Sequence, residues 1–342
     1  MNILYGVQGT GNGHISRSRE IILQLKSMGH HVDVILSGRA PEAFWDMEDF
    51  KPYKAYRGLT FITHKGKIDY TKTAMQLNLP QLYSDIRSYQ TNGLDLVVTD
   101  FEPIAARIAK KHKIPCLGIG HQYAFYHDIP FANGNFVARY IIRNYAPAEI
   151  PIGLHWHHFN QPILPPIIPT TLNSATPRQE PHKVLVYLPF EALTDIISLI
   201  HSFEYHNFFI YHDVKEADDI GNLHIRPFSR QGFLQDLEEC TYVISSAGFE
   251  LISEALILGK KILVKPLEGQ MEQYSNALAI RELNLGMDMN TLDKEIVGEF
   301  LESSDAKTVN YPDVALLIAQ WLKKGQWHDV ASLAKECWSL TN

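Results

Sequence analysis

A glycine-rich loop near the start of the chain ends in a histidine, in the order Gly9-Thr10-Gly11-Asn12-Gly13-His14. The apolar run before it, residues 3–5, predicts a β-strand, and residues 15–26 predict a helix with an apolar stripe. The loop therefore leads into a helix N-terminus, where free backbone N–H groups and the helix dipole favour a phosphate or a carboxylate. His14 adds a side chain that can take up a proton near neutral pH.

The glycine spacing differs from that of a dinucleotide-binding fingerprint. Gly9, Gly11 and Gly13 alternate where G-x-G-x-x-G is required. Ser37-Gly38-Arg39 stands where an acidic residue is expected at the end of the second strand. We therefore expect no nicotinamide or flavin cofactor.

A carboxylate, Asp100, follows the nearly continuous apolar run 94–99, which is typical of a buried parallel strand. Carboxyl ends of parallel strands meet at one edge of a sheet, so Asp100 is expected to face the same cleft as the glycine loop. There it would orient His14 and stabilise the imidazolium ion. Alternatively, it caps the helix that begins near Pro103. The sequence leaves both roles open.

Two segments in the second half of the chain have residue types that bind anions and hydroxyl groups. Residues 245–254 predict a strand, a small-residue loop and a helix N-terminus, which is a second anion site, with Glu254 two turns into the helix and suited to a ribose diol. Residues 266–277 follow a strand and carry Glu272 and Gln273, whose side chains suit sugar hydroxyls. The alternative for this second segment is a solvated helix start.

The composition indicates an ordinary globular protein. The chain has 342 residues, a net charge of −7 and 45% hydrophobic residues, which allows two domains and does not indicate a general nucleic-acid binder. Cys116, Cys240 and Cys337 have neither metal-ligand nor disulfide spacing, so we expect a reducing cytoplasm. We expect no signal peptide and no transmembrane helix.

Strand and helix patterns alternate in both halves of the chain, which favours doubly wound parallel sheets. A proline-rich stretch, 150–181, separates the two halves. We predict an N-terminal Rossmann-like domain over 1–165, a linker over 166–182, a second Rossmann-like domain over 183–312, and a helical tail over 313–342 that packs back on the first domain. Such a pair binds ligands in the cleft between its domains.

Residues 245–254 and 266–277 together resemble the donor-binding half of the GT-B glycosyltransferases, as in the plant and antibiotic types and the peptidoglycan N-acetylglucosaminyltransferase. The opening loop is similar to the acceptor-side loop of the peptidoglycan enzyme, with one residue inserted. The resemblance covers both sides of the cleft and so most of the chain. The matching donor-side positions are Gly248, Glu254, Gly259, Glu272, Gln273, Asn276 and Ala277.

The resemblance implies an α/β GT-B fold with two Rossmann-like domains facing a central cleft. It implies a metal-independent hexosyltransferase that moves a sugar, with inversion, from a nucleotide diphosphate sugar, a UDP-sugar above all, to an acceptor hydroxyl. His14 would be the base and Asp100 its partner. The implied donor-binding residues are Ser246, Gly248, Glu254, Glu272 and Gln273, and the implied acceptor-binding residues are Gly11, Asn12, Gly13 and His121.

Two positions depart from the family pattern. Glu250 and Leu251 stand where plant-type enzymes have Asn and Ser or Thr, and a carboxylate there repels a diphosphate unless it points away or pairs with a cation. Residues 188–191 replace the Gly-Gly-Ser turn of the peptidoglycan enzyme. Two alternatives therefore stay open, a nucleotide-sugar 2-epimerase of the same fold and a non-catalytic nucleotide-sugar or glycan-binding protein.

The acceptor is expected to be a glycan, a lipid-linked sugar or a small molecule, in cell-envelope or polysaccharide assembly. We expect a cytoplasmic protein, with peripheral contact at the inner face of the membrane as an option. Residues 121–159 are rich in aromatic side chains, which we assign mainly to the core. Residues 155–158, His-Trp-His-His, lack a Cys or carboxylate partner, so we expect no metal site.

Overall fold

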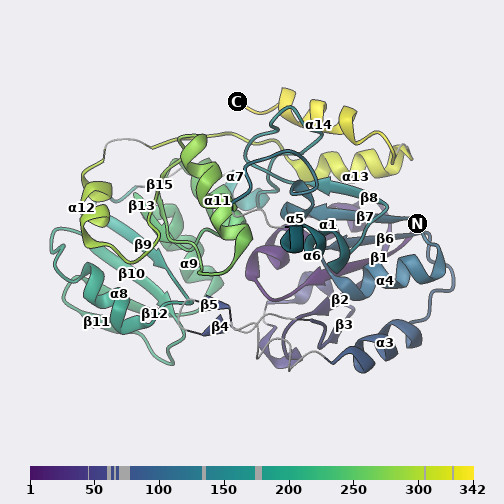
Figure 1. Ribbon diagram of the computed structural model, residues 1–342, viewed down its shortest axis with the longest axis horizontal. Helices are drawn as coiled ribbons and strands as arrows, with labels where there is room; N and C mark the ends of the chain where they lie inside the picture. Colours follow the sequence, from purple (N-terminus) through teal and green to yellow (C-terminus); the bar gives the residue numbers. More distant parts are fainter. Residues whose placement is uncertain are drawn as a thin grey trace.

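The computed structural model describes residues 1–44, 46–59, 63–64, 67–68, 78–132, 136–173, 179–303, 306–325 and 327–342. These residues form two α/β lobes that lie side by side, each built around one mainly parallel sheet (Figure 1). The first sheet takes its strands from the N-terminal half of the chain, and the second from the C-terminal half. The predicted α/β architecture with two Rossmann-like units is confirmed.

The N-terminal sheet has parallel strands in the order β3-β2-β1-β6-β7-β8. Their bounds are β1 Asn2–Gln8, β2 His31–Ser37, β3 Tyr53–Tyr56, β6 Leu96–Asp100, β7 Cys116–Gly120 and β8 Ile150–Gly153. Val7 of β1 pairs with Asp100 of β6, so the carboxyl ends of these strands are adjacent. This register places the glycine loop beside Asp100.

Helices cover this sheet on both faces. In the sequence, each of the five labelled helices of the described N-terminal lobe lies between two strands. They are α1 Asn12–Ser27, α3 Leu79–Ser88, α4 Pro103–His112, α5 His121–Ala124 and α6 Phe136–Tyr145, with 3₁₀ turns at Pro41–Ala43 and Glu48–Phe50. Strands β4 (Thr63–His64) and β5 (Lys67–Ile68) form a separate antiparallel pair.

The C-terminal sheet has the order β11-β12-β10-β9-β13-β14-β15, and its pairs are parallel except for β11 with β12. Its strands are β9 Lys183–Tyr187, β10 Asn207–His212, β11 Asp218–Ile220, β12 Leu223–Pro227, β13 Tyr242–Ser245, β14 Lys261–Val264 and β15 Met287–Asp288. Its helices are α8 Leu193–Ile200, α9 Arg230–Glu239, α10 Phe249–Ile257, α11 Met271–Glu282 and α12 Lys294–Glu302.

The chain crosses back to the first lobe at its C-terminal end (Figure 1). Helix α7 (Thr170–Asn173) lies in the predicted linker, and α13 (Val314–Lys324) and α14 (Val330–Ser339) form the tail. Helix α13 contacts α1, and the Trp338 indole N–H donates to the Ile163 carbonyl at 2.6 Å. The residue bounds assigned to the domains stay a prediction. No helix in the described residues combines the length and apolar character that a membrane span requires.

Most strands and helices predicted from the sequence lie within two or three residues of the observed ones. Three differ more. The pattern of residues 277–283 predicts a helix, whereas α11 begins at Met271. The tail is two helices, because Gly325 takes a left-handed φ of 73° and ends α13. The mixed pattern of residues 73–90 predicts a helix. Residues 73–77 lie outside the described residues, and α3 begins at Leu79 after the capping residue Asn78.

Candidate active site

The glycine loop connects β1 to α1 at the edge of the sheet that faces the second lobe. Gly11 is the N-cap of α1, and no side chain caps this helix end. Gly13 lies so close to α10 that an added Cβ would be 2.6 Å from Glu250 Cγ. The N-terminus of α1 and the N-terminus of α10, which begins after the N-cap Gly248, therefore meet across the lobes. Two positive helix ends face this junction.

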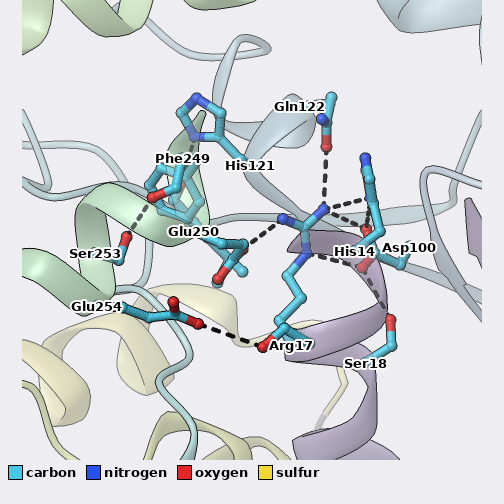
Figure 2. Close-up of polar contacts among 12 residues, drawn as sticks. His14, Arg17, Ser18, Asp100, His121, Gln122, Phe249, Glu250, Ser253 and Glu254 are labelled. Carbon is cyan, nitrogen blue, oxygen red and sulfur yellow. Dashed lines mark hydrogen bonds and ion pairs between the residues drawn. The ribbon is translucent and has the colours of Figure 1, made fainter. Parts of the chain in front are cut away.

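His14 and Asp100 form the pair expected of a base and its carboxylate partner. His14 Nδ1 lies 2.9 Å from Asp100 Oδ1, and the Ser18 hydroxyl donates to Asp100 Oδ2 at 2.9 Å (Figure 2). The His14 side chain is 14% exposed, whereas that of Asp100 is 1% exposed. The imidazole is therefore partly exposed to solvent, while the carboxylate behind it is shielded from water.

The alternative role of Asp100 as a helix cap is taken by a different residue. Glu102 is the N-cap of α4 and accepts hydrogen bonds from the Ile104 and Ala105 backbone N–H groups at 2.9 and 2.6 Å. Burial raises the pKa of Glu102 to about 7, against these hydrogen bonds, which lower it. Asp100 therefore does not cap α4, and its carboxylate contacts side chains of α1 instead.

Arg17 is the centre of the site, and the sequence reasoning missed it. Its Nε and Nη2 donate to the two oxygens of Asp100 at 2.8 and 2.5 Å, and its Nη1 donates to Glu250 Oε1 at 2.6 Å. Nη2 also lies 2.7 Å from His14 Nδ1 and donates to Gln122 Oε1 at 3.4 Å. The signal in the sequence was the spacing, because residues three apart share one face of a helix.

Burial and charge act in opposite directions on this cluster. Burial favours the neutral form of Asp100, but the Arg17 guanidinium and His14 outweigh it and lower the pKa of Asp100. For Arg17, burial lowers the pKa, whereas the charges of Asp100 and Glu250 raise it, and the net shift is upward. Both groups therefore stay ionised in the folded protein.

On the donor side, Ser246 and Gly248 precede α10, as predicted. The space around Gly248 is open, since an added Cβ would have no heavy atom within 4 Å. No side chain caps α10, so its first N–H groups lack partners within the helix. Glu250 stands where plant-type enzymes have an uncharged residue, and its carboxylate would repel a diphosphate. In the structure it pairs with Arg17, and this cation offsets the negative charge.

Glu254 lies one turn after Glu250 on the same face of α10 and is 7% exposed. It accepts a hydrogen bond from the Ser16 hydroxyl at 3.5 Å. Burial raises the pKa of Glu254 to about 8, with a further contribution from Glu250. With α1 packed against α10, this carboxylate is shielded from solvent.

Helix α11 places the predicted sugar-binding residues near α5 of the first lobe. The Gln122 amide N–H₂ lies 3.1 Å from both Glu272 oxygens. Gln273 Oε1 accepts from the Leu267 backbone N–H at 2.8 Å. Glu272 therefore lies next to the cluster around Arg17, and the Gln273 oxygen is used by the loop before α11.

His121, predicted to bind the acceptor, is fully buried between the lobes. Its Nδ1 lies 2.8 Å from the Leu154 carbonyl and its Nε2 lies 2.7 Å from Asn276 Oδ1. Its ring stacks on Phe249 with centroids 4.1 Å apart. In this arrangement His121 joins the lobes, and contact with an acceptor requires them to open. Gly11, Asn12 and Gly13 are partly or fully exposed on the loop.

The His155–His158 segment serves packing in the described structure. His155 is 1% exposed and its Nδ1 accepts from the Trp156 backbone N–H at 2.9 Å. The Trp156 indole N–H donates to Ser253 of α10 at 2.8 Å. Within the described residues, no group of three or more His, Cys, Asp or Glu side chains is arranged to hold a metal ion.

Solved structures with the same fold span nearly the whole chain. The glycotransferase of kitacinnamycin superposes with a TM-score of 0.61 at 15% identity, covering 98% of this chain and 97% of its own. Arabidopsis thaliana UGT89C1, solved with UDP, gives 0.56 at 12% identity over 98% and 99% of the chains. The glycosyltransferase VinC, solved with dTDP, gives 0.54 at 12% identity over 98% of both chains. At these identities the likeness establishes the fold.

The family follows from the sequence itself. No curated protein sequence matches this chain closely enough to count as a relative. Residues 1–304 match the model of the glycosyl transferase family 1. The chain therefore belongs to glycosyl transferase family 1 and is a glycosyltransferase with the GT-B fold.

Proposed function

We propose that the enzyme transfers a sugar from a UDP-sugar to an acceptor hydroxyl, with inversion at the anomeric carbon and without a metal ion. The observation that carries this proposal is the 2.9 Å contact between His14 and Asp100 at the junction of two uncapped helix N-termini. A base beside an anion-binding helix end is what attack on a nucleotide diphosphate sugar needs.

In the proposed reaction, His14 Nε2 takes the proton of the acceptor hydroxyl as the acceptor oxygen attacks the anomeric carbon. The bond from this carbon to the phosphate oxygen breaks, and the nucleoside diphosphate leaves with the electron pair. Asp100 stabilises the imidazolium ion through Nδ1–H. The N–H groups at the start of α10 stabilise the leaving diphosphate, so this route needs no metal ion.

For the donor, we propose that Ser246 and Gly248 lie at the diphosphate, Glu254 at the ribose, and Glu272 and Gln273 at the sugar. The Arg17–Glu250 ion pair supports this, because it removes the electrostatic objection to a carboxylate at this position. Two structures of the same fold, solved with UDP and dTDP, support a nucleoside diphosphate. The buried position of Glu254 means that the donor enters between separated lobes.

Calorimetric titration with UDP, GDP and dTDP in the presence of EDTA tests the donor site. We expect micromolar binding of UDP by the wild type, loss of binding in Glu254→Ala, and retention in His14→Ala. Transfer should be abolished in His14→Ala. Absence of binding by all three nucleotides would contradict the donor proposal, and a fully active His14→Ala variant would contradict the role of the base.

For the acceptor, we propose a glycan or lipid-linked sugar of envelope or polysaccharide assembly, bound at residues 11–13 by a cytoplasmic enzyme that touches the membrane. In support, Tyr140 and Ile141 on α6 are 59% and 44% exposed, and Arg139 lies beside them in the sequence. Vesicle flotation with anionic lipids tests this. The wild type should float, and a Tyr140→Ser, Ile141→Ser double variant should remain in solution; equal recovery of the two would contradict membrane contact.

A further inference from the structure

A buried ion pair joins two loops at the carboxyl edge of the second sheet. Lys265 directly follows β14, and Glu191 lies between β9 and α8, in the stretch 188–191 that departs from the family pattern. Lys265 Nζ lies 2.5 Å from Glu191 Oε1, and the two side chains are 8% and 13% exposed. Parallel α/β sheets bind their ligands at this edge, so the pair lies where a ligand of such a fold is expected.

The ion pair connects the ends of β9 and β14, and β13 lies between these two strands in the sheet. On one side of β13, the Lys265 backbone N–H donates to the Ser245 carbonyl at 2.9 Å. On the other side, the Ser246 backbone N–H donates to the Tyr187 carbonyl of β9 at 3.1 Å. The loop 246–248, which leads into α10, therefore starts between the ends of the two strands that the pair connects. The ammonium group of Lys265 thus lies beside the segment proposed to bind the donor diphosphate.

The Lys265 ammonium group has more hydrogens than partners. A lysine ammonium group carries three N–H donors. Within the part of the chain that the structure describes, Glu191 Oε1 is its one hydrogen-bond partner. The Lys265 side chain is 8% exposed, so water reaches only a small part of it. Unused donors on a cation in such surroundings favour a ligand with several oxygen atoms.

Two other buried lysines of the same lobe differ from Lys265 in their partners and in their place in the sheet. Lys183 contacts the carboxylates of Asp236 and Glu239, and Lys260 donates to two backbone carbonyl groups at 2.7 Å each. Lys183 is the first residue of β9 and Lys260 precedes β14, so both lie at the amino edge of the sheet. Of these three lysines, Lys265 has the fewest protein partners and lies at the edge where ligands bind.

We propose that Lys265 is a further donor-binding residue whose ammonium group contacts the diphosphate of the nucleotide sugar. Glu191 holds this group in place when no donor is bound, and diphosphate oxygens take up the unused N–H donors. As the bond from the anomeric carbon to the phosphate oxygen breaks, its electron pair adds a negative charge to the leaving nucleoside diphosphate. The ammonium group stabilises that charge. This inference rests on the proposed function, which places the diphosphate at Ser246 and Gly248.

Calorimetric titration with UDP in the presence of EDTA tests this role. Loss of the cation in Lys265→Met should weaken UDP binding about 10- to 100-fold, the usual effect of losing a hydrogen bond to a charged group. Glu191→Gln should strengthen UDP binding, because it removes a carboxylate that competes with the diphosphate for the ammonium group. Opposite changes in the two variants distinguish ligand contact from a purely structural ion pair, whose loss would act in the same direction in both.

Lys261→Met is the matched control for net charge. Lys261 begins β14 at the opposite end of the strand from Lys265, and its Nζ contacts the Ser303 carbonyl. This variant loses the same charge and should keep wild-type UDP affinity. A double variant covers the case in which Lys265→Met does not fold. With Glu191→Gln already present, Lys265→Met leaves no carboxylate without its partner, so the double variant should fold and bind UDP at least about tenfold more weakly than Glu191→Gln alone.

Three results would overturn the inference. They are unchanged UDP affinity in Lys265→Met, equal losses in Lys265→Met and Lys261→Met, and UDP binding in Glu191→Gln that is no stronger than in the wild type. Inorganic pyrophosphate is a second probe, which separates this inference from the proposed function. Lys265-dependent binding of pyrophosphate by a protein that binds no nucleotide would contradict the proposed function and retain the anion contact. UDP binding that needs Glu254 but not Lys265 would contradict the role of Lys265 alone.

Discussion

Arg17 and Glu250 join the two lobes through a buried ion pair, with Nη1 and Oε1 2.6 Å apart. The two side chains are 3% and 7% exposed, so both charges have left water. Burial raises the pKa of Glu250 to about 7, although Arg17 opposes this shift. Asp100 satisfies the other side of the guanidinium. Removal of the Arg17 guanidinium would leave two buried carboxylates, those of Asp100 and Glu250, without their shared cation.

Replacement of Arg17 by Met should therefore be strongly destabilising. Loss of one partner from a buried charge pair typically lowers the free energy of unfolding by about 3–5 kcal/mol. Glu250→Gln should cost less, since its amide oxygen still accepts from Arg17. Urea unfolding measures both effects.

The matched control for these variants is the exposed pair Arg230–Asp46, which also joins the lobes. Its side chains are 38% and 43% exposed, with 3.1 Å between Arg230 Nη1 and Asp46 Oδ2. Arg230→Ala should change the free energy of unfolding by less than about 1 kcal/mol. If Arg17→Met costs no more than this, the buried cluster does not hold the lobes together.

Asp100→Asn should slow sugar transfer while leaving nucleotide affinity unchanged. Both Asp100 oxygens accept hydrogen bonds, one from Ser18 and both from Arg17, so an amide nitrogen in either place faces a donor. The His14 ring then loses its fixed partner, and we expect a loss of about 10²–10⁴ in turnover. Turnover and calorimetry on the same preparation measure the two effects.

Ser18→Ala is the control for this substitution. It removes one donor to Asp100 Oδ2, whereas Arg17 Nε still donates to that oxygen at 2.8 Å. Turnover should fall much less than in Asp100→Asn. Equal losses in the two variants would indicate general damage to the site and would count against a base supported by Asp100.

The sequence predicts well those parts of the site that depend on one sheet edge. His14 and Asp100 follow adjacent parallel strands, so the apolar runs before them already place both residues at the same edge. The sequence leaves open whether Asp100 partners His14 or caps the helix near Pro103. The structure gives the cap to Glu102, and the chain between the two carboxylates turns at Phe101, whose φ is 52°.

The contacts between the lobes could not be predicted in this way. Arg17 and Gln122 have partners far away in the sequence, Glu250 and Glu272, and these meet only through the relative placement of two sheets. No local pattern encodes that placement. The helical spacing of His14 and Arg17 could have marked Arg17 as a neighbour of the base. It could not have revealed the carboxylate on α10.

The buried Glu254 should make stability fall as pH rises. Burial, with help from Glu250, raises the pKa of Glu254 to about 8, while an unfolded chain titrates near about 4.3. Between these values the folded protein holds a proton that the unfolded chain has lost. The free energy of unfolding therefore decreases by about 1.4 kcal/mol per pH unit for this group as pH rises.

Urea unfolding at pH 5, 6, 7 and 8 measures this dependence. Glu254→Gln should flatten the slope, and Glu102 and Glu250, each with a pKa of about 7, account for the slope that remains. Glu299→Gln, on the exposed side of α12, is the control and should leave the slope unchanged. Parallel slopes for the wild type and Glu254→Gln would refute the linkage.

Two glycines at the lobe junction should respond differently to an added methyl group, with a loss of stability at Gly13 and little change at Gly248. In Gly13→Ala the Cβ would lie 2.6 Å from Glu250 Cγ and 3.1 Å from its Cβ, so α1 and α10 must move apart. Such overpacking typically costs about 1–3 kcal/mol. Gly248→Ala meets no heavy atom within 4 Å and has a φ of −78°, which alanine adopts freely.

The stability of Gly248→Ala should therefore stay within about 1 kcal/mol of the wild type, because the weaker helix cap and the lower entropy of the unfolded chain offset each other. Its nucleotide affinity should nevertheless fall, since the new methyl group stands where the diphosphate is proposed to meet the α10 N–H groups. Thermal unfolding and UDP titration of the two variants separate these effects. Wild-type UDP affinity in Gly248→Ala would contradict the proposed position of the diphosphate at this helix end.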